Sequence, residues 1–479
     1  MPEGKALKGN GHMAPKFGTS GLRGLVVELT PDLIATHITA FIRSCPIGTG
    51  LFVGCDLRDS SPRIAGDVIS VARSLSVDVT DCGAVPTPAL ALAAMGAGAG
   101  AVMVTGSHIP ADRNGLKFYT PEGEITKAHE AAILAALGTP AVTVVEGRLA
   151  LAEPGPAFVA RYVTAFGAQA LAGRRVGVWS HSAVGRDLLM QTMAALGAEV
   201  VEIARSESFI PVDTEAVPEA IRAFLCETVQ AQGLDAIVST DGDGDRPLVT
   251  DETGVVIPGD ILGQITARLM GAGIAVTPVS SNTGIEAVSA LGSPVAQVIR
   301  TRIGSPFVIA GMEEALASDP EAKVVGYEAN GGFLLGFTAK GPAGPLAALM
   351  TRDSHLPIIA TLVAAGPDGL AARIASEPER FTATDRLQEV PTEASAALVA
   401  NLRDDVAAQA DFLADFGDAT LAGTDTTDGL RLTLSSGRII HLRPSGNAPE
   451  LRFYAEAESA QAAVALLAKG LASLRARVC

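Results

Sequence analysis

The chain has 479 residues, more than one ordinary hydrophobic core accommodates, so three or four domains are expected. Its 36 basic and 52 acidic residues give a net charge of −16. That balance argues against a nucleic-acid or anionic-membrane surface, but a local arginine cluster could still bind phosphate. The five cysteines show no CxxC spacing, which predicts free thiols in a reducing cytoplasm.

The N-terminal segment "MPEGKALKGNGHM" has no apolar core and does not read as a signal peptide, so a cytoplasmic location is expected. Residues 84–111 contain no Asp, Glu, Lys or Arg and could be mistaken for a membrane span. Pro86, Pro88 and several glycines interrupt this stretch. A helix over 88–96 followed by a buried strand over 100–105 is the better interpretation.

Short β-branched runs alternate with Ala/Leu-rich helical patterns, which predicts βα units and largely parallel sheets. In chain order, strands are expected at 50–56, 174–180, 198–204, 234–240 and 323–329, and helices at 61–75 and 183–197. A helical stretch at 393–413 leads into hairpin-like strands at 428–446, which suggests a separate α+β module. With seams near 152–158, 256–260 and 375–395, we predict domains at 1–153, 154–257, 258–374 and 375–479.

The segment "LDAIVSTDGDGDRPLVTD" (234–251) places Asp241, Asp243 and Asp245 two residues apart between apolar runs. Glycines let such a loop bend until the three carboxylates converge, and their repulsion then requires a cation. Hard oxygen ligands select Mg²⁺, Mn²⁺ or Ca²⁺. An EF-hand is excluded because Arg246 stands where the sharp turn needs glycine and the flanks are strand-like. A solvated acidic turn is the remaining structural alternative.

The segment "GAVMVTGSHIPADRNGLKFY" (100–119) carries a buried strand directly into Ser107 and His108. Strand ends are where α/β proteins place chemistry, although a serine there is more often a turn residue. No G-x-S-x-G elbow is present, and His108 is poorly placed to act as the base of its own neighbour. Lys117 is a further candidate base or phosphate contact.

Three glycine-rich loops could bind phosphate or sugar, although each could also be an ordinary polar turn. "KFGTSGLRG" (16–24) presents Arg23, and "GYEANGGF" (326–333) presents Glu328 and Asn330, a pair suited to sugar hydroxyls. The loop "RPSGNAPELR" (443–452) presents Arg443, Ser445, Gly446 and Asn447.

Taken in this order, the segments resemble the α-D-phosphohexomutase superfamily, which includes bacterial phosphomannomutase/phosphoglucomutase and phosphoglucosamine mutase. "DGDGDR" and "RPSG" carry most of the resemblance, supported by "VGCDLRDSSPRIAG", "GAVPTPALALA", "IPGDILG" and "RTRIGSPFV". The resemblance implies an α/β protein with four domains around a central cleft. Three would be mixed α/β domains of related topology, and the fourth a C-terminal α+β domain.

The resemblance also implies roles for particular residues. Ser107 would carry a phosphoryl group, with Arg23, His108, Lys117 and Arg246 as active-site basic residues. Mg²⁺ would bind to Asp241, Asp243, Asp245 and the phosphorylated Ser107. Glu328 and Asn330 would bind the sugar, Arg443, Ser445, Gly446 and Asn447 the distal phosphate, and Arg302 lies in a loop that often supplies another substrate contact.

The reaction so implied interconverts hexose 1-phosphate and hexose 6-phosphate, with mannose favoured and glucose plausible, through a hexose 1,6-bisphosphate. The alternatives are a phosphoglucosamine mutase and a non-catalytic sugar-phosphate-binding relative. Substrate choice is the feature most affected by departures from the family pattern at Gly106, Ile109 and Gly332 and in the loop at Asn447, Ala448 and Glu450. A monomer or homodimer is expected.

Overall fold

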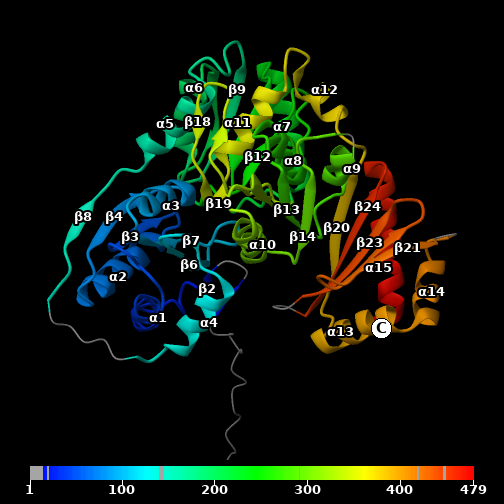
Figure 1. The fold of residues 1–479 in the computed structure, drawn as a ribbon, viewed down its shortest axis with the longest axis horizontal. Helices are drawn as coiled ribbons and strands as arrows, with labels where there is room; N and C mark the ends of the chain where they lie inside the picture. Colours follow the sequence, from blue (N-terminus) through cyan, green and yellow to red (C-terminus); the bar gives the residue numbers. More distant parts are fainter. Residues whose placement is uncertain are drawn as a thin grey trace, which may run out of the picture.

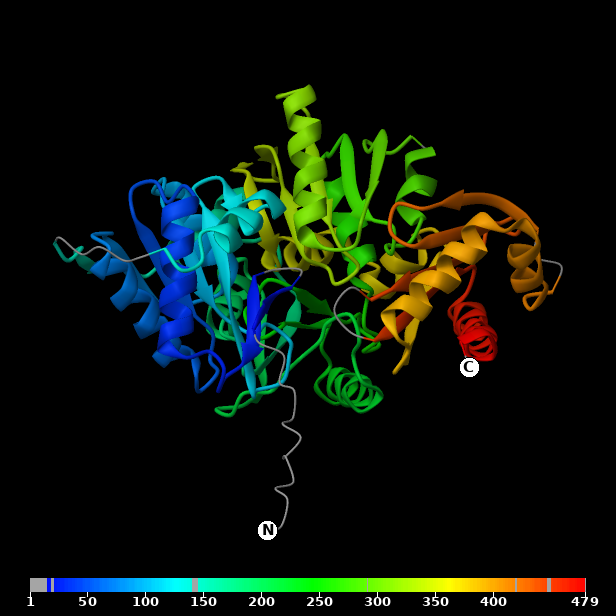
Figure 2. The same cartoon turned by 90° about the horizontal axis from the view of Figure 1, so that it is seen from below.

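The computed structural model describes residues 15–18, 21–139, 145–290, 292–417, 420–445 and 449–478. Gly446 and Asn447 therefore lie outside the described residues. Four large β-sheets follow one another along an arc, with the N-terminal sheet at one end and the C-terminal sheet at the other (Figure 1). In the view from below, the N-terminal and C-terminal domains again lie at opposite ends, with the other two domains between them (Figure 2).

The first sheet has the order β1-β2-β6-β5-β3-β4-β8, with β7 paired to β6. Its strands are β1 (Lys16–Phe17), β2 (Leu22–Leu25), β3 (Leu51–Cys55), β4 (Val79–Ala84), β5 (Gly100–Val104), β6 (Arg113–Thr120), β7 (Gly123–Glu124) and β8 (Leu149–Leu151). Its helices are α1 (Pro31–Ser44), α2 (Ser61–Ser74), α3 (Thr87–Gly96) and α4 (Lys127–Ala135). The parallel strands β4, β3 and β5 come from βα units, whereas β6 and β2 run antiparallel.

The second sheet has the order β10-β9-β11-β12, with only β12 antiparallel to its neighbour. Its strands are β9 (Arg175–His181), β10 (Glu199–Arg205), β11 (Ala236–Thr240) and β12 (Pro247–Val249), and its helices are α5 (Gly155–Phe166), α6 (Arg186–Ala195) and α7 (Glu219–Gln232). All five residues of β11 are buried, which explains their unbroken apolar and hydroxyl composition.

The third sheet has the order β14-β13-β15-β16-β19 and again mixes parallel with antiparallel pairs. Its strands are β13 (Ile274–Pro278), β14 (Gln297–Thr301), β15 (Val324–Tyr327), β16 (Phe333–Leu335) and β19 (Leu349–Asp353), beside a small ribbon of β17 (Ala339–Lys340) and β18 (Pro345–Leu346). The helices are α8 (Gly259–Leu269), α9 (Gly284–Ala290), α10 (Ser305–Ser318), α11 (His355–Ala364) and α12 (Gly369–Ala375).

The fourth sheet is wholly antiparallel, in the order β20-β24-β23-β22-β21. Its strands are β20 (Phe381–Gln388), β21 (Leu421–Asp425), β22 (Leu430–Leu434), β23 (Ile439–Pro444) and β24 (Glu450–Ala457), with helices α13 (Thr392–Asp404), α14 (Val406–Ala414) and α15 (Ala460–Val478). The single helical stretch expected at 393–413 is divided in two. Asp405 has an extended backbone, and its side chain caps α14 by accepting from the amides of Ala407 and Ala408.

The uncharged stretch at 84–111 forms α3 and the buried strand β5, as predicted. Within the described residues, no single helix has the length and apolar character needed to cross a membrane. Helices α11 and α12 reach that length only as a pair, and the pair is bent by 92°.

The first three sheets share one continuous apolar core, whereas the fourth has a core of its own. Between the second and third sheets, the Tyr162 hydroxyl donates to Asp353 at 2.7 Å. Polar contacts join the fourth domain to the third. The buried Glu456 accepts from the amide of Thr283 at 3.2 Å, and Asp428 accepts from the amide of Ile303 at 3.0 Å. The fourth domain is therefore the one most easily repositioned.

Packing in the fourth domain depends on the missing side chain of Gly470. A Cβ at this helical position would lie 2.0 Å from Cζ of Phe453 in the sheet beneath. We expect Gly470→Ala to destabilise the protein by about 1–3 kcal/mol, although alanine is the better helix former. Gly66→Ala in α2, where a Cβ would meet nothing within 4 Å, is the matched control and should stabilise by up to about 1 kcal/mol. Equal shifts in urea denaturation for the two variants would contradict this packing.

Candidate active site

The candidate site gathers at strand ends from the first three sheets. Ser107 follows β5, the aspartate loop follows β11 and the loop with Glu328 follows β15. Lys117 on β6 and Arg23 on β2 reach the same place from neighbouring strands. Ligand sites at the carboxyl ends of strands are the general expectation for α/β proteins.

Ser107 has a left-handed backbone, with φ of +54°, although it is not a glycine. Such a conformation costs about 1–3 kcal/mol and persists only where neighbouring groups enforce it. The Ser107 amide donates to Thr105 Oγ1 at 2.7 Å, and its hydroxyl donates to Asp241 Oδ2 at 2.6 Å. The strained turn thus aims the hydroxyl at the aspartate loop.

Arg58 enforces the conformation of the Ser107 loop. Its guanidinium is fully buried, pairs with Asp56 at 3.1 Å and stacks on the Phe209 ring, with its central carbon 4.0 Å from the ring centroid. It donates to four backbone carbonyls, those of Ser107 at 2.9 Å, Ile109 at 2.6 Å, Pro110 at 2.7 Å and Arg113 at 3.0 Å. A Cβ on Gly106 would lie 2.7 Å from Arg58 Cζ, which explains the glycine found where the family pattern has alanine.

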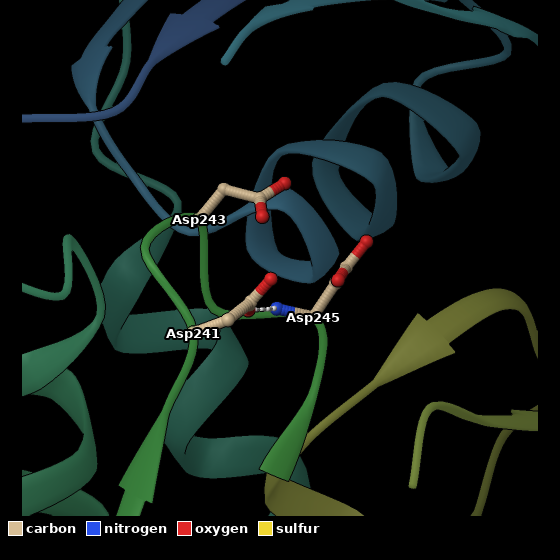
Figure 3. A group of neighbouring side chains, drawn as sticks. All are labelled: Asp241, Asp243 and Asp245. Carbon is tan, nitrogen blue, oxygen red and sulfur yellow. Dashed lines mark hydrogen bonds between the residues drawn. The ribbon is translucent and has the colours of Figure 1, made fainter. Parts of the chain in front are cut away.

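The aspartate loop turns Asp241, Asp243 and Asp245 toward one another (Figure 3). All three residues are fully buried, and one oxygen from each lies within 4.8 Å of the others. The Asp245 amide donates to Asp241 Oδ1 at 3.2 Å, the contact drawn in Figure 3. Loop carbonyls accept from elements of three sheets: Gly242 from the Val184 amide, Asp243 from the Thr87 amide and Gly244 from the Ser354 hydroxyl.

Positive charge partly balances these carboxylates. The Lys117 ammonium donates to Asp243 Oδ2 at 2.6 Å and to Asp245 Oδ2 at 2.5 Å. Burial acts to raise the pKa of Asp243, but Lys117 and the Thr87 hydroxyl outweigh burial and lower it well below its usual range. Burial, reinforced by its two acidic neighbours, raises the pKa of Asp241.

A cation fits this arrangement. Among the described residues, no group donates a hydrogen bond to Asp243 Oδ1 or Asp245 Oδ1, although both atoms are buried. Buried carboxylate oxygens without donors are costly unless a cation binds them. Clustered oxygen ligands are the donors that hard divalent cations prefer.

His108 and Arg246 lie beside the Ser107 hydroxyl. Arg246 Nη1 donates to His108 Nδ1 at 3.0 Å. His108 Nδ1 also lies 3.3 Å from Ser107 Oγ. Since arginine can only donate, Nδ1 carries no proton. Burial, aided by Arg246 and Arg23, lowers the pKa of His108 to about 2, so the ring is neutral. Burial and Arg246 also lower the pKa of Arg23 to about 10.

Glu328 and Asn330 are buried in the loop after β15. The Asn330 side chain accepts from the Gly332 amide at 3.0 Å, and Glu328 Oε1 receives no hydrogen bond from the described residues. Burial raises the pKa of Glu328, and the charges of Arg352 and Arg246 oppose that rise.

The remaining predicted residues that the structure describes are Arg302, Arg443 and Ser445, and they lie at the junction of the third and fourth domains, not beside Ser107. Arg443 pairs with Asp428 at 2.8 Å, and Ser445 is buried at the end of β23. Arg302 donates to the Thr427 carbonyl at 3.3 Å, in the same turn as Asp428. The structure therefore separates a distal basic region from the serine and aspartate cluster.

Sequence reasoning missed several residues that shape the site. Thr87 and Arg58 lie in quoted segments, but no spacing marked them as partners of Asp243 and of the Ser107 loop. Arg352 pairs with Asp245 at 2.8 Å from within "LMTRD", an ordinary strand pattern. Arg452 lies opposite Arg443 on β24 and adds to the distal basic region.

Comparison with known proteins places these features in a family. Models of the phosphoglucomutase/phosphomannomutase family match alpha/beta/alpha domain I at residues 14–141, domain II at 157–254, domain III at 250–357 and the C-terminal domain at 386–473. The chain belongs to this family, whose members are phosphosugar mutases.

Individual relatives agree with that assignment. A phosphomannomutase from Sinorhizobium fredii is 46% identical over 477 residues, covering 96% of this chain and 99% of the relative, and one from Salmonella muenchen is 39% identical, covering 96% of each. A phosphoglucosamine mutase from Xylella fastidiosa is 30% identical, covering 67% of this chain and 74% of the relative. A solved phosphoglucomutase/phosphomannomutase family protein from Burkholderia thailandensis superposes with a TM-score of 0.75 at 20% identity, covering 96% of this chain and 97% of that one.

These matches confirm the predicted family, the fold class and the enzyme class, an intramolecular phosphotransferase. The domain boundaries after residues 153, 257 and 374 and the roles of individual site residues stay predictions.

The contacts of Arg58 predict that it sets the reactivity of Ser107 from a distance. Arg58→Met should lower kcat about 10²-fold, because it releases four carbonyls and allows the serine turn to shift by about 1 Å. Steady-state kinetics with hexose 1-phosphate would measure this loss. Arg63→Met, which removes an exposed arginine from the helix α2 that follows Arg58, is the control and should leave kcat unchanged. Full activity in Arg58→Met would contradict the assignment.

Proposed function

We propose that the chain is a phosphomannomutase that interconverts mannose 1-phosphate and mannose 6-phosphate, using a phosphoryl group carried on Ser107. The observation that carries this proposal is the 2.6 Å hydrogen bond from the strained Ser107 hydroxyl to Asp241 within a buried cage of three carboxylates. A hydroxyl held there suits a phosphoryl carrier because positive charge lies at the same cage: Lys117 pairs with Asp243, Arg246 contacts His108 beside Ser107, and Arg23 lies within electrostatic range of Asp243.

In the proposed cycle, the distal phosphate of the substrate docks on Arg443, Ser445, Gly446 and Asn447, and Glu328 with Asn330 holds the sugar hydroxyls. The free hydroxyl at the other end of the sugar then attacks the phosphorus on Ser107. A new P–O bond forms to the sugar as the bond to Ser107 Oγ breaks. Lys117 or His108 relays the proton: it takes up the hydroxyl proton while it gives a proton to the departing Ser107 Oγ, so atoms and charge balance.

The product of this step is the hexose 1,6-bisphosphate. It turns end for end, and the reverse transfer returns the other phosphate to Ser107. Arg246 and Arg23 offset the charge on the equatorial oxygens in both directions. Polar contacts connect the fourth domain to the third, which suits a domain that must move while the intermediate turns.

The cage fits Mg²⁺, which Asp241, Asp243, Asp245 and a phosphoryl oxygen on Ser107 would hold and which would supply Lewis-acid stabilisation of the transferring group. We further propose a cytoplasmic enzyme that acts as a monomer or homodimer and binds neither nucleic acid nor membranes. The net charge of −16 and the free thiols at Cys45, Cys55, Cys82 and Cys226 support this setting.

Phosphorylation of Ser107 can be measured directly. Intact mass spectrometry of the purified protein should show one phosphate-sized increment that is absent from Ser107→Ala. The same variant should lose about 10³-fold or more in turnover, because it has no oxygen to carry the phosphoryl group. Ser318→Ala, an exposed serine on α10, should keep both phosphate and activity. Full turnover by Ser107→Ala would refute the carrier role.

Substrate preference can be measured as kcat/KM for mannose 1-phosphate, glucose 1-phosphate and glucosamine 1-phosphate at equal concentration. We expect mannose 1-phosphate to be the best substrate, glucose 1-phosphate to follow and glucosamine 1-phosphate to be turned over least. A preference for glucosamine 1-phosphate would instead identify a phosphoglucosamine mutase. Binding without turnover of all three would identify a non-catalytic sugar-phosphate-binding relative.

A further inference from the structure

Arg352 on β19 is a buried arginine whose guanidinium lies among three carboxylates from three different sheets. Nη2 is 2.8 Å from Asp245 in the aspartate loop. Nη1 is 3.7 Å from Glu328 in the loop that follows β15, residues 328–332, which we call the sugar loop. Nε is 3.8 Å from Glu124 on β7 of the first sheet. Only 2% of the Arg352 surface is exposed, so solvent does little to screen these charges.

The neighbouring Gly332 makes room for this side chain. A Cβ on Gly332 would lie 2.7 Å from Arg352 Cδ and 2.9 Å from Cγ. Any larger residue at 332 would therefore displace the aliphatic part of Arg352. Gly332 and Arg352 therefore depend on each other in this chain, because the glycine leaves the space that the arginine side chain fills.

The three carboxylates depend on Arg352 to different degrees. Glu124 also accepts from the Thr351 hydroxyl at 3.0 Å, and Asp245 also pairs with Lys117. Among the described residues, Arg352 forms the one ion pair recorded for Glu328. Glu328 Oε1 is buried and receives no hydrogen bond from those residues, so it remains available to a ligand hydroxyl.

We propose that Arg352 is a positioning residue for sugar recognition, which ties the Glu328 carboxylate to the aspartate loop so that Glu328 can accept hydrogen bonds from ring hydroxyls. This inference rests on the proposed hexose-phosphate function. It assigns Arg352 no contact with the reacting atoms. Through Arg352, the sugar loop is held in register with Asp245, one of the three carboxylates beside Ser107.

Lysine is the informative replacement because it keeps the positive charge but not the planar three-nitrogen fork. Lysine can pair with Asp245, yet it cannot reach Glu328 and Glu124 at the same time. Arg352→Lys should therefore loosen Glu328 while leaving the aspartate loop neutralised. Arg268→Lys is the matched control, since Arg268 pairs with Glu377 near the far end of α8.

The test crosses protein variants with substrate variants. We would measure kcat/KM for mannose 1-phosphate and for its 2-, 3- and 4-deoxy analogues in the wild type, Arg352→Lys, Glu328→Gln, the double variant and Arg268→Lys. In the wild type, removal of a hydroxyl bound by Glu328 should cost about 10²-fold, because a buried carboxylate oxygen is left without a donor. In Arg352→Lys, the same removal should cost less than about 5-fold, with the loss on the parent substrate mainly in KM.

Three results would support the proposal together: a reduced deoxy penalty in Arg352→Lys, no further reduction in the double variant and a wild-type penalty in Arg268→Lys. An unchanged penalty in Arg352→Lys, or an equal loss on every substrate, would overturn it. Circular dichroism and thermal unfolding establish that each variant is folded. Failure of the wild type to convert any hexose 1-phosphate would instead refute the proposed function, so the two failures are distinguishable.

Discussion

The repulsion among three buried carboxylates is the constraint on which the rest of the site depends. Asp241, Asp243 and Asp245 place one oxygen each within 4.8 Å of the others, away from solvent. At an effective dielectric constant near 20, each pair of charges at such a distance repels by about 3–4 kcal/mol. Summed over the three pairs, this repulsion is comparable to the whole free energy of unfolding of a typical domain, about 5–15 kcal/mol. Such a loop can persist only where the fold brings cations to it.

Each of the first three domains contributes to that compensation. Lys117 comes from the first sheet, Arg246 from the second and Arg352 from the third. The Ser107 hydroxyl donates into the same cage, so the group proposed to carry phosphate also belongs to the charge balance. This explains why residues far apart in sequence must meet at one point, and why the domains between them pack through a shared apolar core. The fourth domain has a separate core and holds the distal basic region.

Much of this architecture could be predicted because its signals are local. The spacing in "DGDGDR" indicated a cation site, and the strand before Ser107 indicated where chemistry would lie. The uncharged stretch at 84–111 was interpreted as a helix and strand from its prolines and glycines, and it forms α3 and β5. The break at Asp405 was missed because helical composition continues across it, and only the capping geometry reveals two helices.

Other features depend on contacts between distant residues and had no local signal. In the sequence, Arg58 is a single charged residue shortly before a helix. In the structure, it donates to four backbone carbonyls around Ser107, and its guanidinium leaves no room for a Cβ at Gly106. Arg352 reads as one polar residue in an ordinary strand, and its role appears only when β19 lies beside the aspartate and sugar loops. Gly332 was recognised from sequence as a departure from the family pattern. The structure supplies a physical reason for it, because Arg352 occupies the adjoining space.

We propose that the three aspartates form a divalent-cation cage beside a Ser107 that carries a phosphoryl group. The decisive experiment is a crystal structure of the phosphorylated protein grown with Mn²⁺, in which anomalous diffraction locates the metal. We expect a strong anomalous peak within coordination distance of Asp241, Asp243, Asp245 and a phosphoryl oxygen on Ser107. An anomalous map without a peak in the cage at saturating Mn²⁺, with Lys117 still bridging Asp243 and Asp245, would contradict it.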